Sequence, residues 1–176
     1  GGDAFDFIGG GFNNCIIPSL STACGNVIVG GMCNNNTNDS HVSFLGGGLE
    51  NCTNAFAQVI GGGTNNTPFG EYDVIVGGKG GYSKGGNYSF IGGGAGNFIE
   101  TAGCSVVVGG ETNCITNGIY STIGGGQGNK IESNRGFIGG GASNRICTNS
   151  HCSTIGGGYF NKIGTTTPNT NIEIRP

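Results

Sequence analysis

Large and charged residues are scarce in this chain of 176 residues, which contains no Trp, one Met and four Pro and is only 10% charged. An ordinary globular domain has about 25% charged residues, so the composition is not that of a typical enzyme. The low Pro content and the absence of a strict glycine triplet exclude a collagen helix. No run of about 18 apolar residues is present either, so we expect no membrane insertion.

Basic residues are also few, with seven Lys and Arg against ten Asp and Glu. All seven follow residue 78, whereas six of the ten acids precede it. The basic residues do not cluster beside aromatic residues, so we expect no nucleic-acid partner. The acidic first part and the basic second part instead favour head-to-tail stacking of copies.

Glycine dominates what is present, at 41 of 176 residues. In a helix interior each Gly costs about 1 kcal/mol relative to Ala, so long helices are disfavoured. A hydrophobic share of 35% with a net charge of only -3 also argues against disorder. The fold must therefore come from a regular placement of the apolar residues.

An apolar residue precedes each glycine cluster, and we call it the anchor residue. The ten anchors, spaced 15 to 20 residues apart, are Ile8, Ile28, Leu45, Ile60, Ile75, Ile91, Val107, Ile123, Ile138 and Ile155. Asn lies six positions after nine of them, and Ile lies eight positions after six. The best copies, residues 89–99, 121–131 and 153–163, read Ser-Phe/Thr-Ile-Gly-Gly-Gly-x-x-Asn-x-Ile. Such an internal repeat is typical of a solenoid.

A unit of about 16 residues is too short for two helices but suits two short strands and two turns. The repeat predicts an all-β fold, a β-solenoid (β-roll) of about ten coils over residues 1–163. Coils stacked at the strand spacing would make a rod on the order of 50 Å long. Residues 164–176 are predicted to form a linker and a C-terminal strand for capping or subunit joining, because an open solenoid end leaves backbone groups unpaired.

The residue before each anchor is Phe, Val or Thr, and we call this column the outer stripe. Its members are Phe7, Val27, Phe44, Val59, Val74, Phe90, Val106, Thr122, Phe137 and Thr154. Successive strand residues face opposite sides of a sheet, so the stripe and the anchors are expected on opposite faces. An exposed apolar stripe predicts burial against another copy of the chain. The alternative is a wider coil that encloses both columns in one core.

These Ser-x-Ile-Gly units resemble the head repeats of trimeric autotransporter adhesins, over roughly residues 5–163. The resemblance implies a fibrous, surface-exposed β-roll whose three chains pack through apolar strands. The chain differs from those heads in its cysteines and in carrying Asn where they have small apolar residues.

Eight cysteines, none in a Cys-x-x-Cys spacing, favour disulfides and an oxidising, extracellular compartment. The repeat positions suggest a bridge between Cys104 and Cys114 within one coil and a second between Cys147 and Cys152 at a turn. The remaining candidates, which would pair among themselves or with another subunit, are Cys15, Cys24, Cys33 and Cys52.

No constellation of residues indicates catalysis. The glycine clusters match the calcium-binding nonapeptide superficially, but Asn replaces its aspartate in nine of ten copies. His41 and His151 lie four residues before an anchor and are interpreted as solvated loop residues. The carboxylates occupy different positions of the repeat and form no catalytic pair. We therefore expect no enzyme activity, no cofactor and no metal site.

The sequence thus predicts a structural subunit of an extracellular fibre, appendage or surface layer, located at a cell or particle surface. Its partner would be itself, as a homotrimer or a polymer. The alternative is an adhesin or receptor-binding head that binds a surface glycan or protein.

Overall fold

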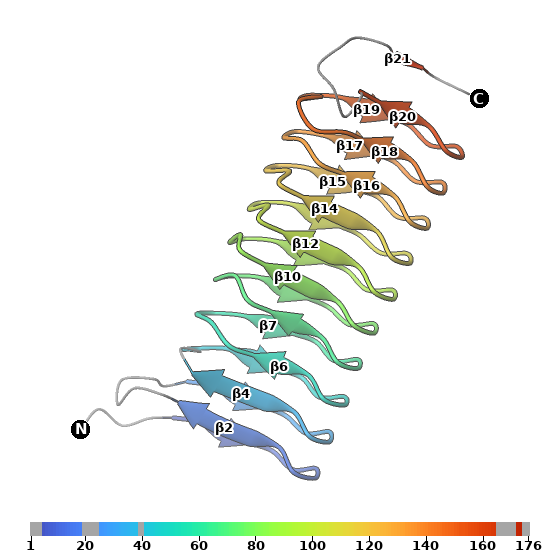
Figure 1. Ribbon diagram of the computed structural model, residues 1–176. Coiled ribbons are helices and arrows are strands. Elements are labelled where there is room, and N and C mark those ends of the chain that lie inside the picture. The colour runs from blue at the N-terminus through green and yellow to red at the C-terminus, as the bar shows by residue number, and fades with distance from the viewer. Residues whose placement is uncertain (1–4, 19–24, 39–40, 165–171, 174–176) are drawn as a thin grey trace.

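The computed structural model describes residues 5–18, 25–38, 41–164 and 172–173. These residues form a rod of stacked coils with two short strands in each coil (Figure 1). The described residues contain strands and turns but no helix. The predicted all-β solenoid is confirmed, with coils about 16 residues apart along the chain.

The first sheet contains ten parallel strands, and each ends on an anchor residue. These strands are β1 (Phe7–Ile8), β3 (Val27–Ile28), β5 (Phe44–Leu45), β7 (Val59–Ile60), β9 (Val74–Ile75), β11 (Phe90–Ile91), β13 (Val106–Val107), β15 (Thr122–Ile123), β17 (Phe137–Ile138) and β19 (Thr154–Ile155). Equivalent residues pair, as Ile91 does with Val107, so every repeat position forms a column along the rod.

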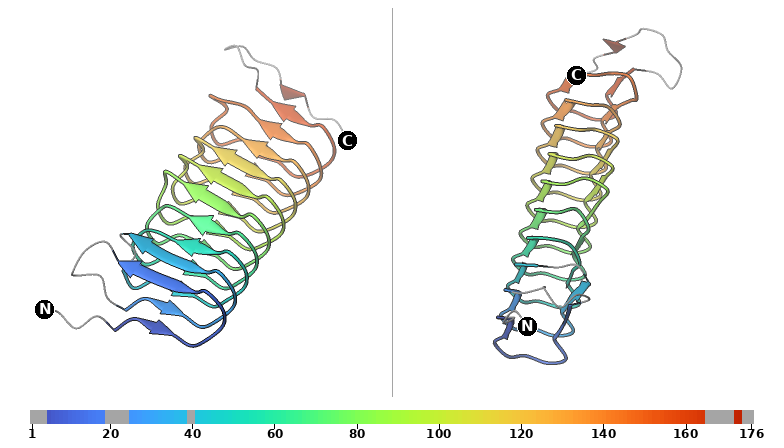
Figure 2. Two further views of the ribbon diagram at one scale, coloured as in Figure 1. Left: turned by 60° about the horizontal axis from the view of Figure 1, so that its bottom comes forward. Right: turned by 90° about the vertical axis from the view of Figure 1, so that its left-hand side faces the viewer.

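The return strands face the first sheet across a flattened coil, as the two rows of strands in Figure 2 show. One return sheet contains β2 (Cys15–Pro18), β4 (Asn35–Asn38) and β6 (Cys52–Thr53). The other contains β8 (Thr67–Pro68), β10 (Tyr82–Lys84), β12 (Phe98–Glu100), β14 (Cys114–Thr116), β16 (Lys130–Ile131), β18 (Arg145–Ile146), β20 (Lys162–Ile163) and β21 (Ile172–Glu173).

The last of these strands, β21, lies in the segment predicted to cap the rod or join subunits. It runs antiparallel to β20 and pairs Ile172 with Ile163. β21 therefore adds a strand to the last coil, where it covers part of an edge that would otherwise remain open.

The interior of the coil is filled by the anchors and by the Ile residues eight positions after them. From Ile28 to Ile155 every anchor is at most 6% exposed, and each fully buried Ile contributes about 1.5 to 3 kcal/mol. The apolar core is divided into two clusters. The division falls between Ile60 and Ile75, where Pro68 and the buried Ser83 occupy the position that is Ile in other coils.

A buried column of Asn residues closes one end of each coil. The amide nitrogen of Asn113 donates to the carbonyl oxygens of Gly109 and Gly126, at 2.9 Å in both cases. Its side-chain oxygen accepts the backbone N–H of Asn129 at 3.0 Å. Each Asn therefore satisfies the backbone of its own turn and of the next coil, which explains why nine repeats carry it.

A column of buried polar residues, two positions before the anchors, lies at the other end of the coil and includes Asp73. Its carboxylate accepts hydrogen bonds from the Gly70 N–H (2.9 Å), the Ser83 hydroxyl (2.6 Å) and the Ser89 N–H (2.8 Å). Burial raises the pKa of the Asp73 carboxyl, although these three hydrogen bonds act in the opposite direction.

The last glycine of the cluster, three positions after the anchor, is required by the stacking. Gly110 has a φ of +89°, and a Cβ built on it would lie 2.1 Å from the carbonyl oxygen of Gly126 in the next coil. A Cβ built on its neighbour Gly109 would meet no atom within 4 Å. The two adjacent glycines therefore differ in function: only Gly110 allows the coils to approach each other.

Substitution of Gly110 should consequently destabilise the rod while substitution of Gly109 should not. We expect Gly110→Ala to lower the free energy of unfolding by about 3 kcal/mol or more, from the left-handed backbone and the overlap together. Gly109→Ala should stay within about 0.5 kcal/mol of the wild type. Urea unfolding followed by circular dichroism measures both, and equal losses in the two variants would refute this role for Gly110.

The raised pKa of Asp73 predicts a pH dependence of stability. Because the folded state holds this proton more tightly than the unfolded chain, acidification from neutral pH through the raised pKa should increase the free energy of unfolding. Asp73→Asn should lack this component, so its stability relative to the wild type should rise with pH and level off above the raised pKa. Urea unfolding between pH 4 and 8 tests this, and Asp6→Asn, an exposed carboxylate of the same column, serves as the control. A relative stability that falls with pH would contradict it.

Candidate functional site

The outer stripe lies on the outside of the first sheet. Each stripe residue is half-buried or exposed, whereas the anchor beside it is buried in every strand from β3 to β19. Among the Phe and Val residues of the stripe, Phe7, Phe44 and Phe137 are the most open, at 55%, 40% and 43% exposed. A wider coil that encloses both columns in one core is therefore wrong.

The outer face of this sheet combines a large and a small residue in most strands. At Gly46 a built Cβ would lie 3.3 Å from the ring of Phe44, which packs over the glycine two positions later. The same arrangement occurs for the other three Phe residues of the stripe. Strands that begin with Val carry a second outward Val in three of four cases, at Val29, Val76 and Val108.

We define the apolar face as the outer stripe together with the residues two positions further along. These additional residues are Gly9, Val29, Gly46, Gly61, Val76, Gly92, Val108, Gly124, Gly139 and Gly156. None of the twenty positions is charged. Ten strands at about 4.8 Å make the face about 43 Å long.

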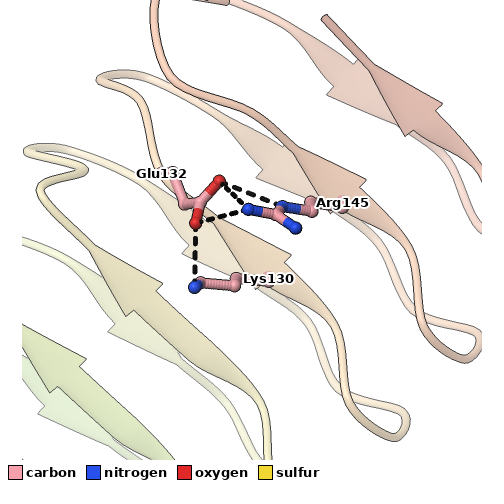
Figure 3. A network of polar contacts seen from close by, with 3 residues as sticks. All are labelled: Lys130, Glu132 and Arg145. Atoms are coloured by element: carbon pink, nitrogen blue, oxygen red, sulfur yellow. Dashed lines mark hydrogen bonds and ion pairs between the residues drawn. The ribbon is translucent and has the colours of Figure 1, made fainter. Parts of the chain in front are cut away.

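The outer face of the return strands has a different character. Tyr82 and Phe98 stack in parallel with ring centroids 5.1 Å apart. Further along, the Glu132 carboxylate contacts the ammonium of Lys130 at 2.8 Å and the guanidinium of Arg145 at 2.7 Å (Figure 3). Partial burial opposes the charge of Glu132, but the hydrogen bonds from the two bases outweigh it and lower its pKa. The two faces of the rod are thus chemically distinct.

The predicted disulfide pairings are corrected by the structure. The seven described cysteines are all free thiols, and Cys24 lies outside the described residues. Cys104 is exposed in the turn that precedes β13, whereas Cys114 faces outward from the return strand β14. The coil interior therefore separates the two thiols. Cys147 is buried and Cys152 is exposed. Repeat positions that oppose each other across a coil therefore point outward on opposite sides.

The remaining cysteine candidates lie on outward or turn positions. Cys15 and Cys52 occupy the return strands, and Cys33 lies in a glycine turn. Burial raises the pKa of the Cys52 thiol despite its hydrogen bond to Thr37, and burial likewise raises that of Cys114. A raised thiol pKa opposes the thiolate that nucleophilic or metal-binding chemistry needs.

The two histidines lie apart from each other. The ring of His41 is 6.1 Å from that of Phe56, and the Nδ1 atom of His151 accepts the backbone N–H of Asn134 at 3.3 Å. Within the described ranges, no three residues among His, Cys, Asp and Glu come together as a metal site would require.

An aromatic cleft was not predicted from the sequence. It is an open surface cavity of about 720 Å³ at one corner of the rod, beside the turns that connect β6 to β7 and, in the next coil, β8 to β9. Its walls include His41, Asn54, Phe56, Phe69, Glu71 and Tyr72. The signal that could have found it is the recurrence of aromatic residues three or four positions before the anchors.

The backbone at this corner is left-handed in eight coils, although none of the eight residues is Gly. The residues, with φ between 51° and 62°, are Val42, Ala57, Tyr72, Tyr88, Cys104, Tyr120, Arg135 and Cys152. Hydrogen bonds between coils hold this conformation, as when the Tyr72 N–H donates to the Phe56 carbonyl at 3.0 Å. The corner side chains are thereby held in a column.

No protein-family model matches the chain, and no curated protein matches it either. Within the described ranges, no helix has the length and apolar character needed to cross a membrane. The fold and the apolar face define the chain as a β-solenoid repeat protein, and its function is inferred from its own surfaces.

Proposed function

We propose that this solenoid is a structural subunit of an extracellular fibre, appendage or surface layer, and that it assembles by packing its apolar face against other copies. The carrying observation is the face itself, which holds twenty uncharged positions on ten strands in one continuous strip. Water contact with such a strip is unfavourable, and a surface without charges packs on another of the same kind without burying an unpaired charge.

The size of the face limits how strong one pairing can be. A strip about 43 Å by about 10 Å offers on the order of 400 Å² per chain, or about 800 Å² per pair, which is the range of weak interfaces. A single pair of chains should therefore form reversibly. A stable assembly needs several chains around one axis or addition of further copies end to end.

The resemblance to trimeric autotransporter heads supports the first of these arrangements, because those heads pack three chains through apolar strands. The extracellular location rests on the same resemblance alone, because the described cysteines are free thiols and supply no disulfide in its favour. The acidic first part and basic second part of the chain support end-to-end order as well.

Charged substitutions on the apolar face should abolish association without unfolding the coil. Val76 and Val108 are 50% and 53% exposed, so Lys is tolerated at both positions in the single chain. In an assembly these ammonium groups would be buried without partners, and we expect the double variant Val76→Lys/Val108→Lys to weaken association at least about 100-fold. Sedimentation velocity over a range of concentrations measures the effect.

The matched control is Ile17→Lys/Ile119→Lys, at residues that are 55% and 41% exposed outside the apolar face. It should associate like the wild type. A wild-type chain that stays monomeric at all concentrations, or equal losses in the two double variants, would contradict the proposal. Negative-stain microscopy of the wild type separates long filaments from discrete short rods, the form expected of an adhesive head.

A further inference from the structure

The aromatic cleft is a second surface feature with the properties of a ligand site. Its volume of about 720 Å³ lies within the range of about 300 to 1,000 Å³ that is usual for small-molecule sites. Its walls come from turns of successive coils, so residues distant in sequence meet there. None of the lining residues belongs to the apolar face, and the inference drawn from the cleft does not depend on the proposed assembly.

Aromatic rings supply the apolar part of the cleft. Phe56 and Tyr72 meet edge to face, with ring centroids 5.4 Å apart and planes at 67°. The ring of Tyr88 in the following coil stacks on Tyr72 at 4.9 Å with an angle of 1°. Phe56, Phe69 and Tyr72 are 37%, 41% and 40% exposed, so rings of fixed orientation remain open to a ligand.

Amides and a carboxylate supply the polar part. Asn54, Glu71 and Asn87 line the cleft beside the rings. The side-chain oxygen of Asn87 accepts the Glu71 backbone N–H at 3.0 Å, which fixes the amide in place. An amide both donates and accepts hydrogen bonds, whereas a carboxylate accepts two or more.

The lining itself decides the class of ligand. The Glu71 carboxylate on the wall opposes an anion. The aromatic rings offer an apolar surface, and the carboxylate and the amides offer partners for hydroxyl groups. A neutral ligand with one apolar surface and several hydroxyl groups fits this lining.

We propose that the cleft is a saccharide-binding site. A pyranose ring presents a C–H face that packs on an aromatic ring, and its hydroxyl groups donate to carboxylates and exchange hydrogen bonds with amides. The rings of Phe56 and Tyr72 take the C–H face, and Glu71, Asn54 and Asn87 take the hydroxyl groups. The site adds glycan recognition to a solenoid whose other face serves assembly.

A glycan array probed with the N-terminally labelled protein tests the proposal. The wild type should bind one or more of the printed microbial or mammalian saccharides, and the best of them is then titrated as the free sugar by calorimetry. Tyr72→Leu and Glu71→Gln should each weaken that binding about tenfold or more. Glu71 is exposed, so its substitution reports on the cleft even where Tyr72→Leu affects folding.

The chain offers a matched control for each variant. Tyr120 occupies the same repeat position as Tyr72 with the same φ of 59° but lies outside the cleft. Tyr120→Leu and the exposed-carboxylate variant Glu111→Gln should bind like the wild type. No saccharide bound by the wild type, or equal losses in Tyr72→Leu and Tyr120→Leu, would overturn the site. The Val76→Lys/Val108→Lys chain should retain free-sugar affinity, which separates this result from the test of assembly.

Discussion

The hydrogen bonds from each coil to the next are the constraint on which the rest of the structure depends. Parallel strands stack in register, so every residue has its equivalent in the next coil as its neighbour. A side chain is therefore tolerated only if a column of such side chains is tolerated. This condition accounts for the low charge and for the buried Asn column, whose members bond to each other's backbone. It also accounts for glycines such as Gly110, where any Cβ would meet the coil above.

The same constraint determines how much could be predicted from the sequence. Columns that repeat in nearly every coil were evident: the anchors, the Asn residues and the outer stripe all occupy the predicted faces. The division of the core was not evident, because it falls at Pro68 and Ser83, where the residue eight positions after the anchor departs from the repeat. The antiparallel direction of β21 also lay outside the repeat pattern.

The candidate sites were less predictable for the same physical reason. The repeat gives the column of each cysteine but not the side of the coil wall on which its thiol lies, so the pairing of Cys104 with Cys114 failed. The aromatic cleft arises where Phe56 and Tyr72 stand at slightly different distances before their anchors. Such a cavity depends on departures from the repeat, which a search for regularity does not reveal.

The two outer surfaces have different proposed functions: the apolar face serves assembly, and the aromatic cleft binds a saccharide. The apolar face is uncharged over all ten strands, which suits an interface between identical copies, whereas the cleft is confined to a few coils, which suits a site for one ligand. Small-angle X-ray scattering of the wild-type chain tests the central claim most directly, because it gives the mass per unit length of the rod in solution. Lateral packing through the apolar face predicts that, as concentration rises, the mass per unit length reaches about two or three times that of one unpaired chain. A mass per unit length equal to that of one unpaired chain at every concentration would contradict the account.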